Sequence, residues 1–291
     1  MAIFSSTILL VVCLTLSGTF VTPAHAVAAN PLVVQELKHD LSPPLRDLAP
    51  SAQPNTASDR QTLVAHPTGP ALTNSQFDPV AHQPTAPLSV VSTVLNFDGQ
   101  SANDNRNLLG FAFVPPDTNG AVGATQFVQI VNVTLAVYDK STGAVLLGPE
   151  TINTVWKGFG GTCEAGNGGD PVVLYDKLAG RWLVSQLQFN GNFTSNQQCI
   201  AVSTTSDATG SYNRYVFDFG AQLPDYPKFG VWPDAYYYTA NTFAPFGGTF
   251  SFLGAQACAF DRAAMLAGSA ATRVCFQNPP SIASLLPSDL D

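Results

Sequence analysis

Residues 170–219 read DPVVLYDKLAGRWLVSQLQFNGNFTSNQQCIAVSTTSDATGSYNRYVFDF. Four segments of this sequence are rich in Val, Tyr, Phe and Trp and are separated by turns with Asp, Gly, Asn and Ser: 171–175, 181–189, 199–204 and 212–219. Short segments of this composition predict four antiparallel strands that follow one another as a meander. Because a single sheet of this kind cannot bury both of its faces alone, we expect neighbouring sheets built in the same way.

The chain repeats this pattern. Asp117, Asp170 and Asp225 each open a similar unit, at intervals of 53 and 55 residues. Each unit has a short first strand, a tight turn and a more aromatic second strand. A third strand is expected in each unit, at 135–139, 199–203 and 256–261. Repetition of four-stranded units at this period is typical of a β-propeller, and a β-sandwich is the competing architecture.

The sequence therefore predicts an all-β domain over residues 88–291, as a partial propeller of three four-stranded blades. Residues 89–97 are expected to form a strand that completes the last blade, and 98–106 a polar loop. In the third unit, residues 262–267 predict a helical turn capped by Asp261. Propellers close with about four to eight blades, so three units indicate a chain truncated on its C-terminal side. The open sheet edges of such a partial ring predict self-association.

Residues 1–26 have the features of a secretory signal peptide. Residues 8–16 form an apolar core, and residues 24–26 read Ala-His-Ala, a typical cleavage site. This apolar run is too short for a spanning helix and no later run reaches the required length, so no membrane span is predicted. The expected location is outside the cell or in the periplasm.

Residues 27–87 contain ten prolines among Ser, Thr, Gln and Ala, with few aromatic residues and no sustained period. This composition predicts a disordered or extended linker. A propeptide or a spacer that spans the cell wall is the functional alternative. Within this segment, residues 33–37 and 45–48 could form a helical turn or a docking segment.

Removal of the signal peptide leaves four cysteines, Cys163, Cys199, Cys258 and Cys275. An even number in an exported chain predicts disulfide bonds. Of the three pairings, we favour Cys163 with Cys199 and Cys258 with Cys275, because each pair then falls within one repeat. The competing interpretation is a metal site of four thiolates, but the spacings contain no C-x-x-C.

The charge and the histidines exclude several classes of function. The formal net charge is −8 with 11% charged residues, which argues against nucleic acid and anionic membranes as partners. All four histidines, His25, His39, His66 and His82, precede the predicted domain. A Ser-His-Asp triad or a histidine-based zinc site is therefore excluded within the domain, unless the linker folds back or a missing part of the chain supplies a histidine. It also lacks a P-loop and a dinucleotide-binding fingerprint.

Several short motifs resemble those of a known group of proteins. Residues 115–123 read PPDTNGAVG and residues 126–129 read QFVQ. Further matching motifs are Gly169-Asp-Pro171, Gly180-Arg-Trp182 and Phe260-Asp-Arg262 followed by Met265-Leu. With these motifs the chain resembles uncharacterised secreted bacterial proteins that look like sialidase-type (BNR-like) β-propellers. The resemblance covers most of residues 88–291 and implies export, a propeller fold and a chain that continues beyond Asp291. It implies no activity, because the group has no agreed one.

The comparison with sialidases extends to one turn. Residues 205–212 read TSDATGSY and resemble an Asp-box, with one extra residue before the glycine and Tyr212 in place of Trp. Such boxes lie at outer hairpin turns, where the Asp side chain bonds backbone amides, so the expected role of Asp207 is structural. The Arg-Ile-Pro start of a sialidase is absent, and nothing marks three arginines as a carboxylate clamp.

Carboxylates and aromatic rings remain as the groups that could carry chemistry. The first strand of a blade lines the central channel, so Asp117, Asp170 and Asp225 are expected around one rim of it. There they could act as the carboxylates of a glycosidase or as oxygen ligands of Ca²⁺. No other metal or cofactor is predicted. The competing interpretation is structural, because an Asp at a strand start commonly caps backbone amides and would lock one blade to the next.

Aromatic residues offer flat faces on which sugars stack, namely Trp156, Trp182, Trp232 and the run 236–238, although aromatic residues in strands usually pack between sheets. The candidate ligand-binding residues are Asp117, Asn119, Glu164, Asp170, Asp225, Lys228 and Trp232.

Two functions are consistent with these residues. The first is a non-catalytic exported module that binds a glycan or a protein at the cell surface or outside the cell. It is favoured by the absence of histidine and the scarcity of Glu in the domain. The second is a glycoside hydrolase or lyase whose carboxylates surround the channel, with no catalytic residue assigned.

Overall fold

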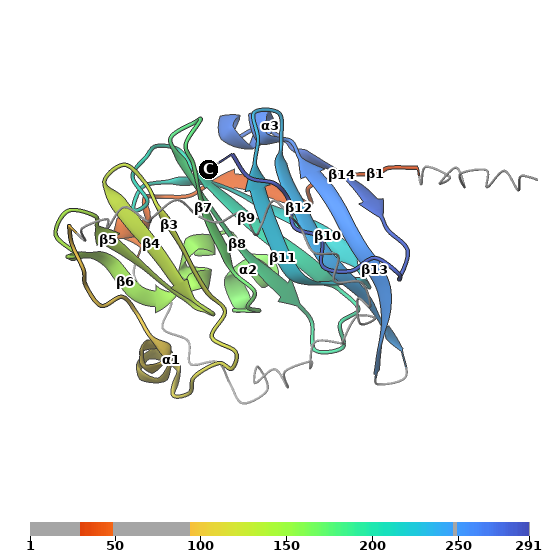
Figure 1. The fold of residues 1–291 in the computed structure, drawn as a ribbon, viewed down its shortest axis with the longest axis horizontal. Coiled ribbons are helices and arrows are strands. Elements are labelled where there is room, and N and C mark those ends of the chain that lie inside the picture. The colour runs from red at the N-terminus through yellow and green to blue at the C-terminus, as the bar shows by residue number, and fades with distance from the viewer. Residues whose placement is uncertain (1–29, 49–93, 247–248, 291) are drawn as a thin grey trace, which may run out of the picture.

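The computed structural model describes residues 30–48, 94–246 and 249–290. Within these ranges the protein is mostly β-structure, arranged as three antiparallel sheets that lie side by side, with a few short helices (Figure 1). The all-β prediction is confirmed. The predicted signal peptide and residues 49–87 of the predicted linker lie outside the described residues. In the described part of the chain, no helix is long and apolar enough to cross a membrane.

Each sheet contains four strands that follow one another in sequence, so each sequence repeat corresponds to one sheet. The first sheet contains β3 (Thr118–Val122), β4 (Gln126–Val131), β5 (Thr134–Asp139) and β6 (Val145–Thr151). The second contains β7 (Val172–Asp176), β8 (Arg181–Phe189), β9 (Asn196–Ser203) and β10 (Tyr212–Gly220). The third contains β11 (Leu223–Val231), β12 (Tyr236–Phe246), β13 (Thr249–Phe260) and β14 (Thr272–Gln277). The meander predicted for residues 170–219 is confirmed.

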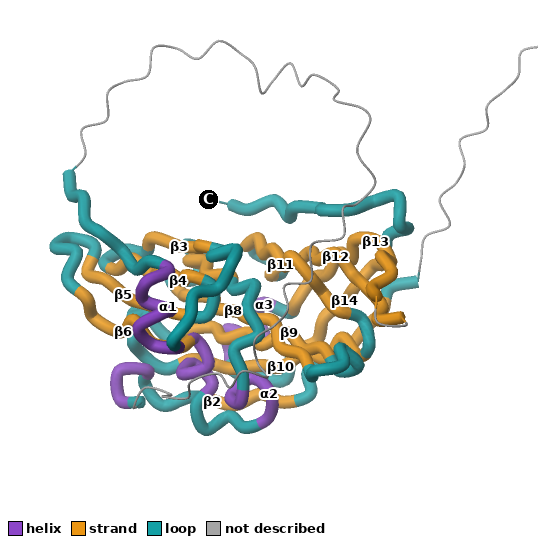
Figure 2. The backbone as a smooth tube through the Cα atoms, turned by 90° about the horizontal axis from the view of Figure 1, so that it is seen from below, coloured by secondary structure: helices purple, strands orange, loops and turns teal. Residues whose placement is uncertain are grey.

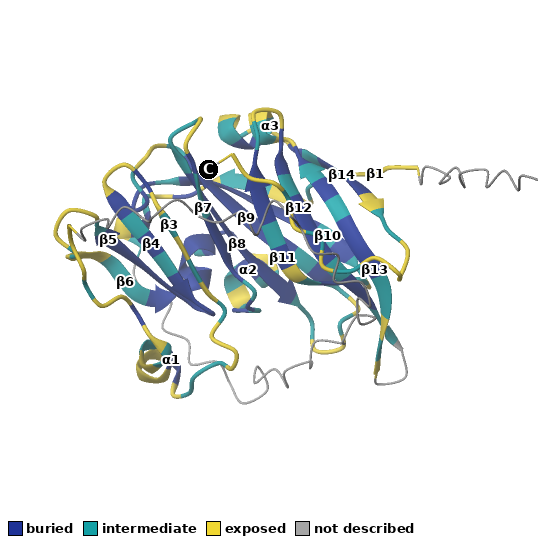
Figure 3. Cartoon of the chain, in the orientation of Figure 1, coloured by how far each residue is buried: buried dark blue, intermediate teal, exposed yellow. Residues whose placement is uncertain are grey.

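The second sheet is buried on both faces, because successive side chains of a strand point to opposite sides. Trp182 and Val184 of β8 pack in a core shared with the first sheet. Leu183, between them, packs in a second core together with Tyr236 and Tyr238 of the third sheet. Figure 3 shows buried residues concentrated along the strands of the second sheet. The second sheet therefore packs between two other sheets, as its sequence predicted.

The first and second sheets approach each other most tightly at Gly123, just after β3. A Cβ atom at this position would lie 2.5 Å from the ring of Trp182, so only glycine fits. Trp182 is fully buried, its ring centroid lies 4.7 Å from that of Tyr175, and its Nε1 donates to the carbonyl oxygen of Ser206 at 3.0 Å. Trp182 thus packs between sheets, as the structural interpretation of the aromatic residues predicted.

The N-terminal part of the predicted linker belongs to the fold, which corrects the prediction of disorder for residues 30–48. β1 (Leu32–Gln35) pairs with β14 and forms the edge of the third sheet. β2 (Lys38–Leu41) pairs with β10 and forms the edge of the second sheet. A 3₁₀ helix follows at Leu45–Asp47. Docking is therefore correct for residues 33–37, whereas at 45–48 both alternatives hold, because the helical turn forms and Leu45 docks in the core.

Specific side chains hold this N-terminal segment in place. Arg214 of β10 donates from Nε and Nη2 to the two carboxylate oxygens of Asp40, at 2.8 and 2.7 Å. Arg214 is 2% exposed, and its Nη1 also donates to the carbonyl oxygens of Val155 and Lys157. Leu45 is buried in the core between the first and second sheets. The segment is therefore attached by a buried ion pair and an apolar anchor as well as by strand pairing.

The chain before the first sheet also differs from the prediction. Residues 94–97 form no strand, and residues 89–93 lie outside the described residues. The predicted polar loop at 98–106 contains most of a helix, α1 (Ala102–Leu109). Ser101 caps this helix, because its hydroxyl accepts from the amide of Asn103 while the Asp104 carboxylate accepts from the amide of Ser101. This reciprocal capping overrides the polar composition of the segment.

Both predicted disulfide bonds are confirmed, Cys163–Cys199 and Cys258–Cys275. The predicted helical turn is also confirmed as α3 (Arg262–Ala267), where the side chain of Asp261 accepts from the amide of Ala264 and Gly268 ends the helix.

The turn between β9 and β10 contains Asp207, whose expected structural role is confirmed. Its Oδ1 accepts from the amide of Thr209 at 2.9 Å, and Gln126 of the first sheet donates to the same oxygen at 2.9 Å. This turn therefore joins the first and second sheets.

A buried ion pair joins the second and third sheets. Asp176, at the end of β7, is fully buried and accepts from Arg262 Nε at 2.7 Å and from the hydroxyl of Tyr236 at 2.9 Å. Burial alone would raise the pKa of Asp176. The hydrogen bonds from Arg262, Tyr236 and the amide of Ala179 outweigh burial and lower the pKa below its ordinary value.

The C-terminal segment covers the outer face of the third sheet. Figure 2 shows it running across β13, β12 and β11. Thr239 donates to the carbonyl oxygen of Leu285 at 2.6 Å, and the amide of Val231 donates to Oδ1 of Asp289 at 2.7 Å. Both faces of the third sheet are therefore covered, one by the second sheet and one by this segment.

We expect the change Asp40→Ala to lower the free energy of unfolding by about 2 kcal/mol, because it leaves the buried guanidinium of Arg214 without its carboxylate. Urea unfolding followed by tryptophan fluorescence measures this difference. The matched control is Arg46→Ala, which breaks the exposed pair of Arg46 with Asp207 at 2.8 Å and should cost less than about 0.5 kcal/mol. Equal losses for the two variants would contradict the role of Asp40 as an anchor.

The Asp176 pair predicts a pH dependence of stability. Because its folded-state pKa is lowered, the stability it contributes is present above the ordinary Asp value of about 3.9 and is lost as the pH falls through the folded-state pKa. We expect Asp176→Asn to cost about 3 kcal/mol at pH 7 and to reduce the loss of stability below pH ~4. Urea midpoints between pH 2.5 and 7 measure both effects, with Asp234→Asn as the control. If stability fell as steeply below pH ~4 in Asp176→Asn as in the parent protein, Asp176 would not be the source of the pH dependence.

Candidate functional site

The first strands of the three sheets lie next to one another, since β3 contacts β7 and β7 contacts β11. A polar cavity of about 280 Å³ lies where β3 and β7 begin, beside the middle of β11. It is lined by Asp117, Thr118, Asn119, Asp170, Pro171, Tyr226 and Lys228. The repeated first strands therefore bring residues separated by about fifty positions in the sequence into one site.

The backbone at this site has one left-handed residue in each repeat. Asp117 and Asp170 have φ values of 40° and 47°, in the left-handed region. In the third repeat the left-handed residue is Tyr226, with φ of 56°, one position after Asp225. The pairing of β11 with β12 is irregular between Asp225 and Lys228. Asp tolerates this conformation better than most residues, whereas for Tyr it is uncommon.

Side chains at the site bond one sheet to the next. Oδ1 of Asn119, in the first sheet, accepts from the amide of Val173 in the second at 2.8 Å. Oδ2 of Asp170 accepts from the amide of Tyr226 in the third sheet at 3.0 Å. The structural interpretation of the repeated Asp, a cap that locks neighbouring units together, therefore holds for Asp170.

Lys228 is the cation of the cavity. Its Nζ lies 3.6 Å from the centroid of the Tyr226 ring and donates to the carbonyl oxygen of Pro227 at 3.1 Å. Burial lowers the pKa of Lys228, and the carboxylates of Asp170, Asp117 and Asp225 oppose this shift without cancelling it. Lys228 therefore sits in a partly desolvated position surrounded by three negative charges.

The structure places the seven candidate residues in three locations. Asp117, Asn119, Asp170 and Lys228 line the cavity. Asp225 does not line it, but its charge acts on Lys228. Glu164 and Trp232 lie elsewhere, so the structure does not bring them to this site.

Glu164 belongs to the short helix α2 (Gly161–Ala165) and serves the loop before it. Its Oε2 accepts from the amide of Gly160 at 2.6 Å. The backbone amide of Gly158 is the largest cause of its lowered pKa, and that of Gly160 contributes in the same direction. Glu164 therefore stabilises a glycine-rich loop.

Trp232 lies beside the C-terminal segment. Its Nε1 donates to the carbonyl oxygen of Ser288 at 3.0 Å. It lines a different cavity of about 490 Å³ between the third sheet and that segment, together with Tyr237 and Leu286. The other two tryptophans are fully buried: Trp182 in β8 and Trp156 in a 3₁₀ helix (Ile152–Trp156). Their rings offer no face to a ligand in solution.

Sequence reasoning missed Thr118, Pro171 and Tyr226. Thr118 and Pro171 directly follow the repeated Asp, so the repeat itself placed them next to predicted residues. Tyr226 follows Asp225 in the same way, but its role depends on the one-residue displacement of the left-handed position in the third repeat. This displacement goes with the irregular pairing of β11 and has no signal in the sequence.

Within residues 30–48, 94–246 and 249–290, no group of three or more His, Cys, Asp or Glu side chains is arranged to hold a metal ion.

Comparison with known proteins shows no family, because no family model, curated protein or solved structure gives a significant match to the chain.

We expect Lys228 to titrate below the usual lysine value of about 10.4. The variant Asp170→Asn should lower its pKa further, because it removes the carboxylate that raises the Lys228 pKa most while keeping a side-chain oxygen for the Tyr226 amide. NMR of the protein with ¹³C-methylated lysines measures the titration, and Asp234→Asn is the control. A higher Lys228 pKa in Asp170→Asn would contradict the proposed electrostatics.

Proposed function

We propose that this chain is an exported, non-catalytic module of the β-propeller type that binds a glycan in the cavity formed by Asp117, Asn119, Asp170, Tyr226 and Lys228. The observation that carries the proposal is the convergence of these residues from three sheets into one polar cavity. A propeller binds ligands at the channel lined by its first strands, and the adjacency of β3, β7 and β11 supports such an arrangement.

The chemistry of the cavity suits a sugar. Carboxylate oxygens accept hydrogen bonds from hydroxyl groups, and an ammonium group donates to hydroxyl and ring oxygens. Tyr226 is 41% exposed, so part of it remains available at the cavity opening. The volume of about 280 Å³ is at the small end for ligand sites. The proposed ligand is therefore a terminal sugar unit of a glycan.

The hydrogen bond that Asp170 accepts from the backbone favours ligand binding over hydrolysis as the function of the cavity. A glycosidase needs one carboxylic acid to protonate the leaving oxygen and a second carboxylate facing it across the bond. Asp170 instead has Oδ2 hydrogen-bonded to the Tyr226 amide, which is a structural contact between sheets. Glu150 does have a pKa raised by burial, but it lies in β6 and does not line the cavity.

Export is supported by the two disulfide bonds, because such bonds persist in oxidising compartments. The proposed location is outside the cell or in the periplasm. Resemblance to sialidase-type propellers remains part of this proposal, on the motifs quoted above.

A glycan array probed with the purified protein tests the proposal. We expect a defined set of glycans to bind, and we expect Lys228→Met and Asp117→Asn each to weaken binding at least about tenfold, or 1.4 kcal/mol, because each removes a polar group from the cavity. Trp232→Phe, outside the cavity, should leave the affinity unchanged. Mass spectrometry of the bound glycan after incubation should show it intact.

Three results would overturn parts of the proposal. Absence of any bound glycan would remove the glycan-binding function. Equal affinity of the parent and both cavity variants would place the site elsewhere. A shortened glycan, with the cleavage lost in Asp117→Asn, would favour the glycoside hydrolase instead.

A further inference from the structure

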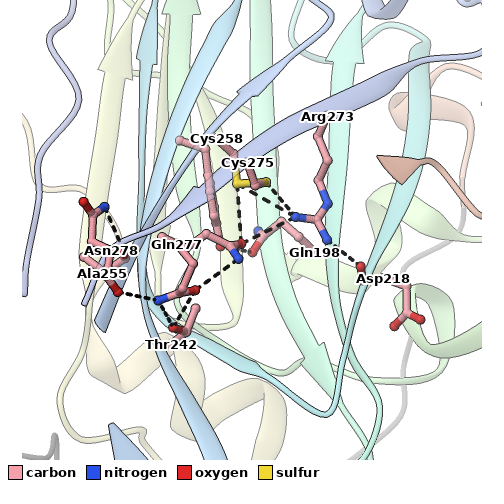
Figure 4. The surroundings of a disulfide bond; sticks show 11 residues. Gln198, Asp218, Thr242, Ala255, Cys258, Arg273, Cys275, Gln277 and Asn278 are labelled. Atoms are coloured by element: carbon pink, nitrogen blue, oxygen red, sulfur yellow. Dashed lines mark hydrogen bonds between the residues drawn. A yellow bond between two sulfur atoms is a disulfide. The ribbon is translucent and has the colours of Figure 1, made fainter. Parts of the chain in front are cut away.

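A buried arginine contacts the disulfide bond of the third sheet. Cys258 of β13 and Cys275 of β14 are directly paired across the two strands. Arg273 lies two residues before Cys275, so its side chain points to the same side of β14. Its Nη1 lies 2.8 Å from Sγ of Cys275 and 3.8 Å from Sγ of Cys258 (Figure 4).

Arg273 has neutral hydrogen-bond partners in the described part of the chain. Its Nη2 donates to the carbonyl oxygen of Asp218 at 2.7 Å (Figure 4). Its Nη1 also lies 3.5 Å from Oε1 of Gln256. The guanidinium also lies over the ring of Phe219, 3.8 Å from its centroid. Arg273 is 2% exposed, and burial lowers its pKa to about 10.

Two other arginines, the buried Arg214 and the partly buried Arg262, have carboxylate partners. Arg214 is bonded to the carboxylate of Asp40, and Arg262 to that of Asp176. A buried cation is costly unless an anion accompanies it. The carboxylate of Asp218 acts on Arg273 through its charge, while Oδ1 of Asp218 accepts from the amide of Gly220. In direct contact with the guanidinium, the group that could become an anion is the sulfur of Cys275, because a cysteine released from a disulfide bond is an anion when deprotonated.

We propose that Cys258–Cys275 is a site of thiol–disulfide exchange, at which Arg273 stabilises Cys275 as the leaving thiolate. The co-reactant is a dithiol reductant. A thiolate of the reductant attacks Sγ of Cys258 and forms a new sulfur–sulfur bond, while the Cys258–Cys275 bond breaks and its electron pair stays on Sγ of Cys275 next to Arg273.

The second half of the exchange completes the reduction. The other thiolate of the reductant attacks the reductant's own sulfur in the mixed disulfide and releases Cys258, which takes up a proton. The protein disulfide thereby gains two electrons, and the reductant leaves as a disulfide. Because a leaving thiol of lower pKa departs faster, the position of Arg273 assigns Cys275 as the leaving group and Cys258 as the sulfur attacked.

The location of the disulfide provides a route to it. Both cysteines are buried, but β14 is bordered on its outer side only by β1 within the described third sheet. Val33 of β1 is 61% exposed and Phe276 of β14 is 47% exposed, so few side-chain contacts hold this edge. Opening of a sheet edge of this kind costs less than global unfolding. The exchange site is also at the opposite edge of the sheet from the glycan cavity, which β11 lines.

The other disulfide provides an internal comparison. Cys163 and Cys199 are equally buried, and they belong to the core between the first and second sheets. The hydrogen bonds described for these two cysteines include none from a cation to sulfur. We therefore expect reduction of Cys258–Cys275 to precede that of Cys163–Cys199.

The variant Cys258→Ser tests the contact directly, because it leaves Cys275 as a free thiol beside Arg273. We expect thiolate absorbance near 240 nm to titrate at least one pH unit below the ordinary cysteine value of about 8.5. Adding Arg273→Gln should raise this titration by at least one unit, and adding Arg273→Lys, which keeps the charge, should restore part of the shift. A Cys275 that titrates at or above the ordinary value with Arg273 present would overturn the proposal.

A second measurement uses the unaltered protein and does not depend on folding of the Ser variant. The protein is treated with dithiothreitol, quenched with an alkylating reagent at intervals, and the labelled cysteines are identified by mass spectrometry. We expect Cys258–Cys275 to be reduced at least tenfold faster than Cys163–Cys199, and Arg273→Gln to remove most of that difference. Equal rates, or earlier reduction of Cys163–Cys199, would overturn the proposal.

Discussion

The strands of the second sheet have no face left for solvent, because Trp182 and Val184 of β8 enter one core while Leu183 enters the other. Every neighbouring element is positioned by the need to cover these two faces. Polar groups at the margins of the cores must then be paired, since an unpaired buried charge is costly. Asp176 with Arg262 meets this requirement at the boundary with the third sheet. At the boundary with the first sheet the buried group is the amide of Gln126, which donates to Asp207 and accepts from the amide of Ala208.

The polar cavity is a consequence of the same packing. Once the sheets are in contact, the starts of β3 and β7 lie beside the irregular part of β11, and each of the three repeats has a left-handed residue there. Asn119 and Asp170 fix the spacing by accepting amide hydrogens from the next sheet. Lys228 of β11, paired with Thr239 of β12, thereby lies among the carboxylates that act on its pKa. The site therefore depends on the contact between sheets and would not exist in one sheet alone.

Features encoded locally were predictable from the sequence, and features that depend on distant partners were not. The meander at β7–β10, the cap of α3 by Asp261 and both disulfides follow from strand composition, capping chemistry and repeat boundaries. β1 and β2 have four residues each, too few to show the alternation of apolar and polar residues that predicts a strand, and their partners are far away in the sequence. At the site, the repeat identified Asp117 and Asp170, whereas residue chemistry alone suggested Glu164 and Trp232, which have other partners.

The attachment of the N-terminal segment also has a consequence for the order of folding during synthesis. The contact of Asp40 with Arg214 spans 174 residues, and that of Glu36 with Ala271 spans 235. Because a ribosome produces the chain from its N-terminus, residues 30–48 emerge before the three sheets but have no strand partner until β10 and then β14 have been made. Contacts of such long range slow the final step of folding. Residues 30–48 thus wait for the outer edges of two sheets that are made after them.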